Sequence, residues 1–222
     1  MIVAIQQPEH LPWLGFFDKM RRCDLYVLLD NVQFKKRYFE NRNKILTANG
    51  PQWVTVPVIS KGRYTQPINQ VMIDNTVNWR RKYLGSVQAA YGRTPYFPEL
   101  FPRLEAVINK EFSRLADLNI ALIEMVRDFT GIDTPMRLAS DILPDTDVHG
   151  SDLILALSRA SGADHYISGP DGRNYLDLGS FLDANIKVSY HDYNHPAYEQ
   201  THGEFSSHMS AVDALFNVGK LP

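Results

Sequence analysis

The fold is decided by residues 2–30, which read IVAIQQPEHLPWLGFFDKMRRCDLYVLLD. Ile2 to Ile5 and Leu25 to Asp30 are short apolar runs, typical of strands covered on both faces. Between them, Leu14 and Phe17 recur at helical spacing. Strand, helix and strand within about thirty residues form the βαβ unit of a parallel sheet. This unit places the first connecting loop at the carboxyl edge of the sheet, where open α/β sheets bind ligands.

The remaining chain extends this pattern. Residues 53–74 alternate in polarity and predict a small antiparallel insertion, and residues 76–131 carry apolar side chains at helical intervals, interrupted by prolines. Two further strands are predicted within residues 165–169 and 186–193. We therefore predict one domain over residues 1–222, an α/β, Rossmann-like (nucleotidyltransferase-like) sandwich with a mostly parallel sheet, a small antiparallel insertion and a helical middle segment.

Composition narrows the function classes. The 222 residues include 23 basic and 25 acidic side chains, so no overall field draws the protein to nucleic acid. Cys23 is the single cysteine, which excludes an internal disulfide and makes the cytoplasm the expected compartment. A lone cysteine at a helix end is more often a small apolar residue than a nucleophile. No apolar run approaches the length of a membrane span.

The loop after the first strand carries the first candidate residues, Gln6, Gln7, His10 and Trp13. Polar amides at the mouth of a parallel sheet are poor core material, and a helix amino terminus nearby attracts anions. The alternative is a connection stiffened by Pro8, with a surface histidine and a core tryptophan.

The second candidate segment, residues 30–45, reads DNVQFKKRYFENRNKI. Its aromatic side chains could cover a planar ring while its cations grip phosphate. The alternative is a solvated edge, because charge runs usually face water. The candidate ligand-binding residues here are Asn31, Gln33, Lys35, Arg37, Asn41 and Arg42.

A third segment, residues 165–177, contains Ser168, Gly169 and Arg173 in what resembles a phosphate-facing turn. It matches neither the Walker pattern nor the dinucleotide fingerprint, and an ordinary β-turn explains most of it.

A fourth segment, residues 190–205, groups His191, His195 and His202 with several carboxylates. This density would suit zinc or iron, but Pro196 follows His195, so a shared helix face is not expected. Substrate hydrogen bonding or aromatic packing is the favoured interpretation.

Taken together, these motifs resemble the WbqC-like family of bacterial proteins over nearly the whole chain. The resemblance lies in Gln-Pro, Pro-Trp-x-Gly, Gln-Phe, Asn-Arg, Ser-Gly, His-Pro-x-Tyr and Leu-Phe-Asn signatures. They fall on Gln7, Pro8, Pro12, Trp13, Gly15, Gln33, Phe34, Asn41, Arg42, Ser168, Gly169, His195, Pro196, Tyr198, Leu215, Phe216 and Asn217.

The resemblance implies an association with bacterial surface polysaccharide (O-antigen, lipopolysaccharide) biosynthesis, and glycyl or aminoacyl transfer to an amino sugar. The first unit also resembles the start of nucleotidyl transferases and pantothenate synthetase, which carry His-x-Gly-His after the first strand. Here the stretch His10 to Trp13 lacks the glycine and the second histidine, which weakens the case for adenylate chemistry.

We expect an enzyme, a transferase or ligase that forms an amide between a small amino acid and an amino sugar, the latter nucleotide-linked, with ATP as the candidate cofactor. The expected catalytic residues are His10, Gln7 and His195. Substrate or phosphate is expected to contact Gln6, Trp13, Asn31, Gln33, Lys35, Arg37, Asn41, Arg42, Ser168, Gly169, Arg173 and Tyr198. The alternatives are a non-catalytic nucleotide or nucleotide-sugar binding module, or a metal-dependent enzyme using the C-terminal histidines. Whether two chains form a homodimer is left open.

Overall fold

The computed structural model describes residues 1–144 and 146–222, which form two compact units. The first unit comprises Met1–Gln7, Gly15–Asn31 and Asp133–Asn194. The second comprises Pro8–Leu14, Val32–Ile132 and His195–Pro222. A single domain over residues 1–222 stays a prediction.

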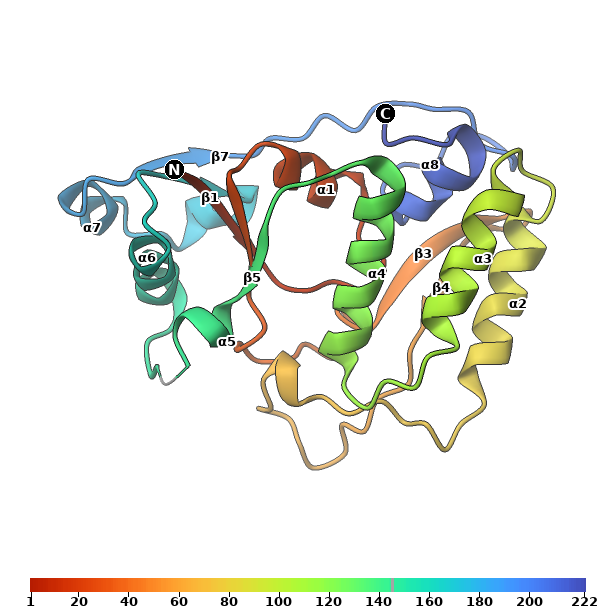
Figure 1. The fold of residues 1–222 in the computed structure, drawn as a ribbon, viewed down its shortest axis with the longest axis horizontal. Coiled ribbons are helices and arrows are strands. Elements are labelled where there is room, and N and C mark those ends of the chain that lie inside the picture. The colour runs from red at the N-terminus through yellow and green to blue at the C-terminus, as the bar shows by residue number, and fades with distance from the viewer. Residues whose placement is uncertain (145) are drawn as a thin grey trace. The chain divides into compact units, whose positions relative to one another are not determined.

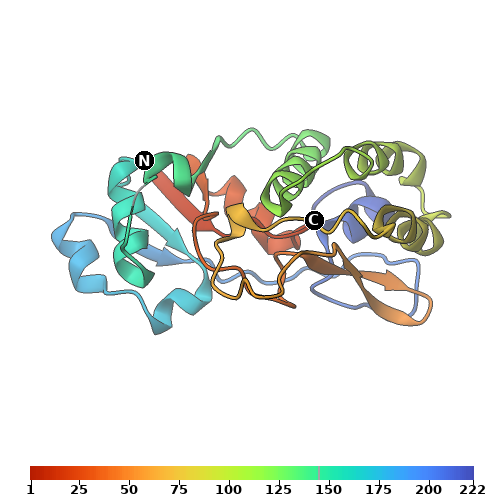
Figure 2. The ribbon, with the colours of Figure 1, turned by 90° about the horizontal axis from the view of Figure 1, so that it is seen from below.

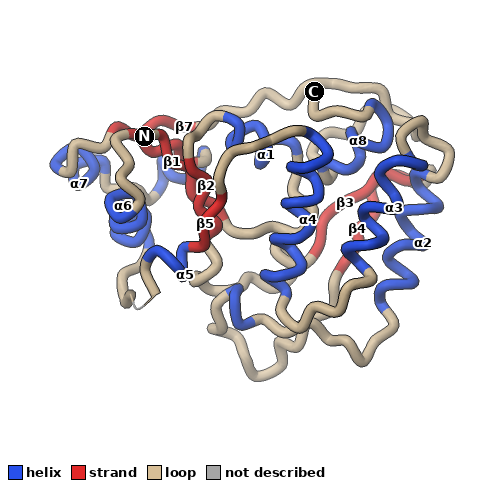
Figure 3. The backbone as a smooth tube through the Cα atoms, viewed as in Figure 1, coloured by secondary structure: helices blue, strands red, loops and turns tan. Residues whose placement is uncertain are grey.

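The first unit is built on a five-stranded sheet in the order β5-β2-β1-β6-β7. Its strands are among those drawn in red in Figure 3. Every pairing in it is parallel. Counted by their position in the chain, the strands lie in the order 3-2-1-4-5, which is the doubly wound order of Rossmann-like folds. The predicted α/β fold class is therefore confirmed. The strands are β1 (Ile2–Gln6), β2 (Leu25–Leu28), β5 (Met136–Leu138), β6 (His165–Ser168) and β7 (Lys187–Tyr190).

The opening strand, helix and strand form as predicted, with α1 (Leu14–Arg21) joining β1 to β2 at the red end of the chain in Figure 1. Phe16, Phe17 and Met20 are fully buried and give α1 its packed side. The other helices of this unit are α5 (Ala139–Ile142), α6 (Gly150–Ala160), the 3-10 turn η2 (Pro170–Asn174) and α7 (Leu178–Asp183).

The second unit combines a β-ribbon with helices, and Figure 2 shows the orange ribbon beside the yellow-green helices. The ribbon pairs β3 (Arg42–Thr47) with β4 (Gly50–Thr55), and α2 packs against both strands. The helices are η1 (Ile68–Gln70), α2 (Trp79–Tyr91), α3 (Phe97–Ile108), α4 (Leu115–Thr130) and α8 (Ala211–Val218). Within the described residues, no helix has both the length and the apolar character that crossing a bilayer requires.

The antiparallel ribbon lies earlier in the chain than the predicted insertion at residues 53–74. Its turn uses Gly50, whose φ of 92° lies in the left-handed region that glycine adopts without strain. The Thr47 hydroxyl donates to the Gly50 carbonyl at 2.8 Å and accepts from the Asn49 amide at 3.2 Å. Beyond β4, Val58 and Ile73 form only an isolated bridge. The Asn-Gly dipeptide is a strong hairpin signal that was overlooked.

Candidate functional site

The carboxyl edge of the parallel sheet gathers polar residues of the first unit. Strands β1 and β6 are neighbours, and the chain continues from them toward opposite edges of the sheet, which makes their ends the topological switch point. Gln6 ends β1 and Gln7 follows it, while Ser168 ends β6 and Gly169 follows it. Ligands of open α/β sheets bind at such a point.

Gln6 and the end of β2 are tied together at this edge. The backbone carbonyl of Gln6 accepts from the amide of Leu29 at 2.8 Å, and its side-chain oxygen accepts from the Tyr26 hydroxyl at 3.3 Å. One strand further along, the Asp30 carboxylate accepts from the Ser140 hydroxyl at 2.6 Å and from its amide at 3.0 Å. These bonds fix the loops that carry Gln7 and Asn31.

Ser168 supports the turn after β6. It is 1% exposed, and its hydroxyl donates to the Gly169 carbonyl at 2.9 Å. A Cβ atom on Gly172 would lie 2.0 Å from the Ser168 oxygen, so only glycine fits there. The Ser168 hydroxyl therefore packs inside the turn. A ligand at this turn would contact backbone atoms, including those of Gly169, rather than the Ser168 side chain.

Arg173 holds a carboxylate in the structure. Its guanidinium donates two hydrogen bonds to Asp192, at 2.9 and 2.7 Å, and lies 4.2 Å above the Tyr190 ring. The bond to Asp192 raises the pKa of Arg173 and lowers that of Asp192. A phosphate would have to compete with Asp192 for this side chain.

A histidine-carboxylate pair that was not predicted lies beside the same edge. His191 follows β7, its amide donates to the Ser168 carbonyl at 2.8 Å, and its Nε2 is 2.6 Å from Asp18. Burial raises the pKa of Asp18, but hydrogen bonds from Arg22 and His191 outweigh it and leave the pKa lowered. The i, i+4 spacing of Asp18 and Arg22 was the sequence signal for half of this arrangement.

In the second unit, the first loop, Pro8–Leu14, lies against the second loop, residues 32–41. Side chains from α4 and β3 also bond to the loop backbones, which leaves the loops little freedom. The hydrogen bonds are His10 N to Phe39 O at 2.8 Å, Asn119 Nδ2 to Pro8 O at 2.8 Å and to Glu40 O at 2.7 Å, and Asn43 Nδ2 to Leu11 O at 2.8 Å.

His10 is fully buried beneath these loops. Its Nδ1 is 3.0 Å from Oδ1 of Asn119, and its Nε2 is 2.9 Å from the Tyr83 hydroxyl. Burial lowers the pKa of His10 to about 4, so the ring is neutral near neutral pH. With both nitrogens engaged, His10 positions the loops in this structure, which gives no support to the predicted contact with a reacting group.

Glu40 is a buried carboxylate at the end of the second loop. It is 0% exposed. Burial raises the pKa of Glu40 to about 7, although backbone hydrogen bonds and the charge of Lys35 oppose the rise, and the charge of Glu9 adds to it. Sequence reasoning missed Glu40 because it is surrounded by cationic and aromatic residues.

Two cations of β3 gather around one indole. The Arg42 guanidinium lies 4.0 Å from the centre of the Trp53 ring, and the Lys44 ammonium lies 5.2 Å from it. Arg42 also donates to the Arg37 carbonyl. Cations over an aromatic face suit a phosphate next to a planar ring.

Two other predicted residues of this region bond to the backbone. The Gln33 side chain donates to the Tyr64 carbonyl at 2.9 Å, and Asn41 donates to the Val56 carbonyl at 2.9 Å. Asn41 is 7% exposed, and its Oδ1 has no donor among the described residues. Lys35 and Arg37 are exposed.

His195 lies in an aromatic cluster with Trp13 and His208, whose ring centres are 6.3 and 5.1 Å from its own. Its Nδ1 donates to the Pro196 carbonyl at 2.9 Å, which makes Nε2 the acceptor nitrogen. Burial lowers the pKa of His195. A neutral, half-buried imidazole with this tautomer suits a proton acceptor.

Tyr198 belongs to a buried network around Asp213. The Asp213 carboxylate accepts from Tyr198 at 2.7 Å, from Tyr91 at 2.6 Å and from Gln200 at 2.8 Å. Asp213 is 0% exposed, so this network anchors α8 and the C-terminal segment. Tyr198 therefore has a structural partner in addition to its predicted role.

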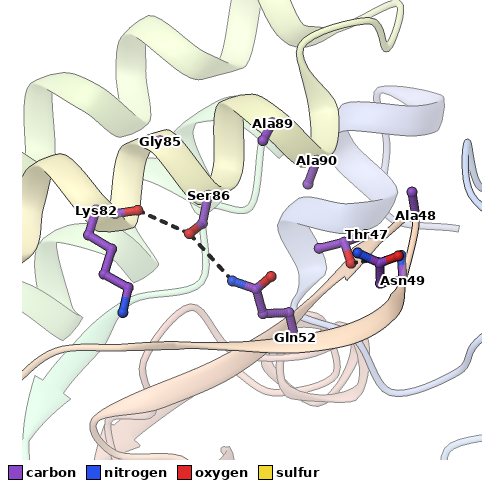
Figure 4. A pocket seen from close by; sticks show the side chains of 9 residues that line it. All are labelled: Thr47, Ala48, Asn49, Gln52, Lys82, Gly85, Ser86, Ala89 and Ala90. Carbon is purple, nitrogen blue, oxygen red and sulfur yellow. Dashed lines mark hydrogen bonds between the residues drawn. The ribbon is translucent and has the colours of Figure 1, made fainter.

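An open hollow of about 440 Å³ lies between α2 and the ribbon (Figure 4). Gln52 donates to the Ser86 hydroxyl at 3.4 Å, and Ser86 donates to the Lys82 carbonyl at 3.0 Å. None of the predicted site residues lines it. The lining residues are Thr47, Ala48, Asn49, Gln52, Lys82, Gly85, Ser86, Ala89 and Ala90.

Among the side chains considered for metal or covalent chemistry, none forms a metal cluster within the described residues, where no three or more metal-ligating side chains occur together. His202 is bonded to the Ala90 carbonyl at 2.7 Å. Burial raises the pKa of the Cys23 thiol to about 12, which makes it a poor nucleophile.

The predicted site residues divide between the two units. The first unit holds Gln6, Gln7, Asn31, Ser168, Gly169 and Arg173. The second unit holds His10, Trp13, Gln33, Lys35, Arg37, Asn41, Arg42, His195 and Tyr198.

Comparison with known proteins gives two findings. The model of the WbqC-like protein family matches residues 7–221. A protein of Mycobacterium tuberculosis (strain ATCC 25618 / H37Rv), described as "Uncharacterized protein Rv1507c", is 34% identical over 219 residues, which cover 98% of this chain and 94% of that protein. No solved structure matches the chain.

Proposed function

This chain belongs to the WbqC-like protein family, and from that premise we propose that it is an enzyme that joins a small amino acid, such as glycine, to the amine of a nucleotide-linked amino sugar. The amide forms after ATP activates the acyl group. The product serves the synthesis of a bacterial surface polysaccharide or a related metabolite.

The observation that carries this proposal is the doubly wound strand order with polar residues at its switch point. Folds of this order bind nucleotides outside the carboxyl ends of the central strands. Gln7 and Gly169 follow the two strands that meet there. In our proposal they contact ATP, together with Gln6, Asn31 and Arg173.

The acceptor is assigned to the loops of the second unit. Arg42 stacked on Trp53, with exposed Lys35 and Arg37, supports binding of a diphosphate next to a flat base. His195, with Trp13 stacked on it, is the proposed proton acceptor on this side. His10 keeps the loops in place rather than touching substrate.

The reaction we propose has two steps. A carboxylate oxygen of the amino acid attacks a phosphorus atom of ATP and displaces pyrophosphate or ADP. The amine nitrogen then attacks the acyl carbon, and the acyl oxygen bond to AMP or phosphate breaks. The protein contributes positioning and charge neutralisation, which suits its arginines and lysines.

The direct test incubates the protein with ATP, glycine and a panel of nucleotide-linked amino sugars. We expect an amide in the mass spectrum and stoichiometric AMP or ADP. A Gln7→Ala variant is expected to lose most of this activity, while Gln52→Ala in the open hollow serves as an amide-matched control that keeps it.

A binding module without turnover is the second candidate. Two observations favour this candidate. Both ring nitrogens of His10 already have hydrogen-bond partners inside the protein, and the raised pKa of the Cys23 thiol makes it a poor nucleophile. Tight binding of a nucleotide sugar without any product from the full panel would select this candidate.

A further inference from the structure

A second hollow, of about 580 Å³, lies between α2 and α3, which run side by side in Figure 1. We call it the helix groove. Its volume is in the range of about 300 to 1,000 Å³ that small-molecule sites occupy. Both helices belong to the second unit, and none of the residues assigned to the proposed reaction lines the groove.

Helical spacing turns one stripe of each helix toward the helix groove. Arg81, Gly85 and Gln88 recur every three or four residues along α2, and Phe101 and Glu105 lie four residues apart on α3. Residues at these intervals share one face of a helix. The two stripes therefore face each other across the groove.

Gly85 is the residue of α2 that packing does not explain. Glycine weakens a helix interior, so a structural role for it there requires a neighbour that leaves no room for a side chain. A Cβ atom on Gly85 would meet no atom within 4 Å. Gly85 borders both the helix groove and the open hollow of Figure 4, in which its place on α2 is labelled. The missing side chain leaves space for a ligand rather than for the protein itself.

The polar side chains that line the helix groove are available to a ligand. Five of them are exposed and make no hydrogen bond or ion pair within residues 1–144 and 146–222. They are Asn78, Arg81, Gln88, Glu105 and Asn109. Convergent polar groups of this kind, around a hollow with an apolar floor, are the usual composition of a small-molecule site.

Arg80 holds the two helices together at one end of the groove. Its guanidinium donates to the carbonyls of Ile108 at 2.9 Å and Lys110 at 3.4 Å, where α3 ends. Its positive charge thereby meets the negative end of the α3 dipole. Arg81 and Glu105 remain as one cation and one carboxylate, so a ligand between them meets balanced charge.

A neutral ligand with several hydroxyl groups fits this set of side chains. Carboxamides donate and accept hydrogen bonds, as hydroxyl groups do, while Arg81 only donates and Glu105 only accepts. Buried Leu84 and half-buried Phe101 form an apolar floor that suits the C–H groups of a sugar ring. A phosphate would be repelled by the Glu105 carboxylate.

We propose that the helix groove is a binding site for a neutral saccharide, with Gln88, Arg81 and Glu105 bonding to its hydroxyl groups and Leu84 and Phe101 beneath its ring. The site lies apart in the chain from the residues of the proposed reaction. The inference therefore does not rest on the proposed function.

The experiment titrates nitrogen-15-labelled protein with D-glucose, D-galactose, D-mannose and L-rhamnose, one at a time, and follows the backbone amides by NMR. At least one sugar is expected to shift the amides of Gly85, Gln88 and Glu105 in a saturable manner. The amides of Thr47 and Asn49, in the open hollow, are expected to stay unchanged. Glycine and inorganic phosphate serve as charged probes and are expected to shift none of these amides.

Substitutions in the helix groove test the contacts. Gln88→Ala and Glu105→Ala are each expected to weaken binding of the responding sugar about threefold or more, because a hydrogen bond is lost. Gly85→Ala should weaken it as well, since a methyl group then occupies the groove, while thermal unfolding shows a fold at least as stable as the wild type. Gln52→Ala, in the open hollow, is the amide-matched control and should keep the wild-type affinity.

Three results would overturn the inference. They are no shift with any of the four sugars, shifts in the helix groove caused only by glycine or phosphate, and wild-type sugar affinity in both Gln88→Ala and Glu105→Ala. Amide formation is not measured here, so failure of the proposed function leaves the saccharide site standing.

Discussion

Nδ1 of His10 donates a hydrogen bond to Oδ1 of Asn119 at 3.0 Å, across 109 positions of sequence. The direction of this hydrogen bond follows from the orientation of the Asn119 amide. Its Nδ2 donates to two backbone carbonyls, so its Oδ1 faces the His10 ring and accepts from it. Nε2 of His10 is then the acceptor for the Tyr83 hydroxyl. One asparagine thus sets the histidine tautomer and joins the two loops.

Replacing Asn119 with alanine tests this arrangement. The variant leaves two buried carbonyls and one ring nitrogen without partners, so we expect the free energy of unfolding to fall by about 3 kcal/mol or more. Chemical denaturation measures it. Asn109→Ala, on the exposed end of α3, is the matched control and is expected to change stability by less than about 0.5 kcal/mol. Equal effects of the two substitutions would contradict the assignment.

Glu40→Gln is expected to become more stable relative to the wild type as the pH rises. The pKa of Glu40 is raised from 4.5 to about 7. Below about pH 4.5 the carboxyl is protonated in both the folded and the unfolded chain, so its ionisation does not affect stability. Between about pH 4.5 and 7 it ionises more readily in the unfolded chain, so the wild type progressively loses stability. The difference in unfolding free energy between the variant and the wild type should grow by about 3 kcal/mol over that window.

His10 titrates in the opposite sense, since its lowered pKa makes the fold lose stability as the pH falls from 6.5 to about 4. Its contribution is present in both proteins and cancels in the difference. Urea unfolding of both proteins at a series of pH values gives that difference directly. A difference that stays constant between the acid and neutral ends would show that Glu40 ionises normally.

Gly172→Ala is expected to destabilise the protein by about 2 kcal/mol, because the new Cβ atom would lie 2.0 Å from the Ser168 oxygen. Gly85→Ala is the control: nothing lies within 4 Å of its Cβ position, and alanine favours a helix, so a small gain in stability is expected. Thermal unfolding of the two variants distinguishes these outcomes. A tolerated alanine at position 172 would mean that the turn is looser than the structure shows.

The first βαβ unit was readable from the sequence because β1 and β2 are largely apolar runs and α1 has a clear buried face. β5 was missed since Met136–Leu138 is too short to show a pattern. The ribbon was misplaced because Trp53–Val58 alternates convincingly, while the Asn49–Gly50 signal that closes the true hairpin was overlooked.

The candidate site was only partly readable. The burial of His10 depends on Tyr83 and Asn119, which are 73 and 109 positions away and carry no local signal. Glu40 was hidden in a cationic run, and its importance comes from burial, which composition does not reveal.

Arg42→Ala is expected to weaken UDP binding by about 1 to 3 kcal/mol, because a charge-assisted contact to phosphate and the cover of Trp53 are lost together. Arg103→Ala removes the same charge from an exposed position on α3 and should leave the affinity unchanged. Calorimetric titration with UDP measures both. If Arg42→Ala binds UDP as the wild type does, the segment of residues 30–45 is a solvated edge rather than a ligand site.

The central claim is that the protein makes an amide from an ATP-activated acyl group. The most direct measurement follows oxygen-18 from the carboxylate of labelled glycine in a reaction with ATP and nucleotide-linked amino sugars, by mass spectrometry. We predict an amide product and one labelled oxygen in AMP or phosphate for each amide formed. Nucleotide-sugar binding without amide or labelled nucleotide from any member of the panel would contradict the account.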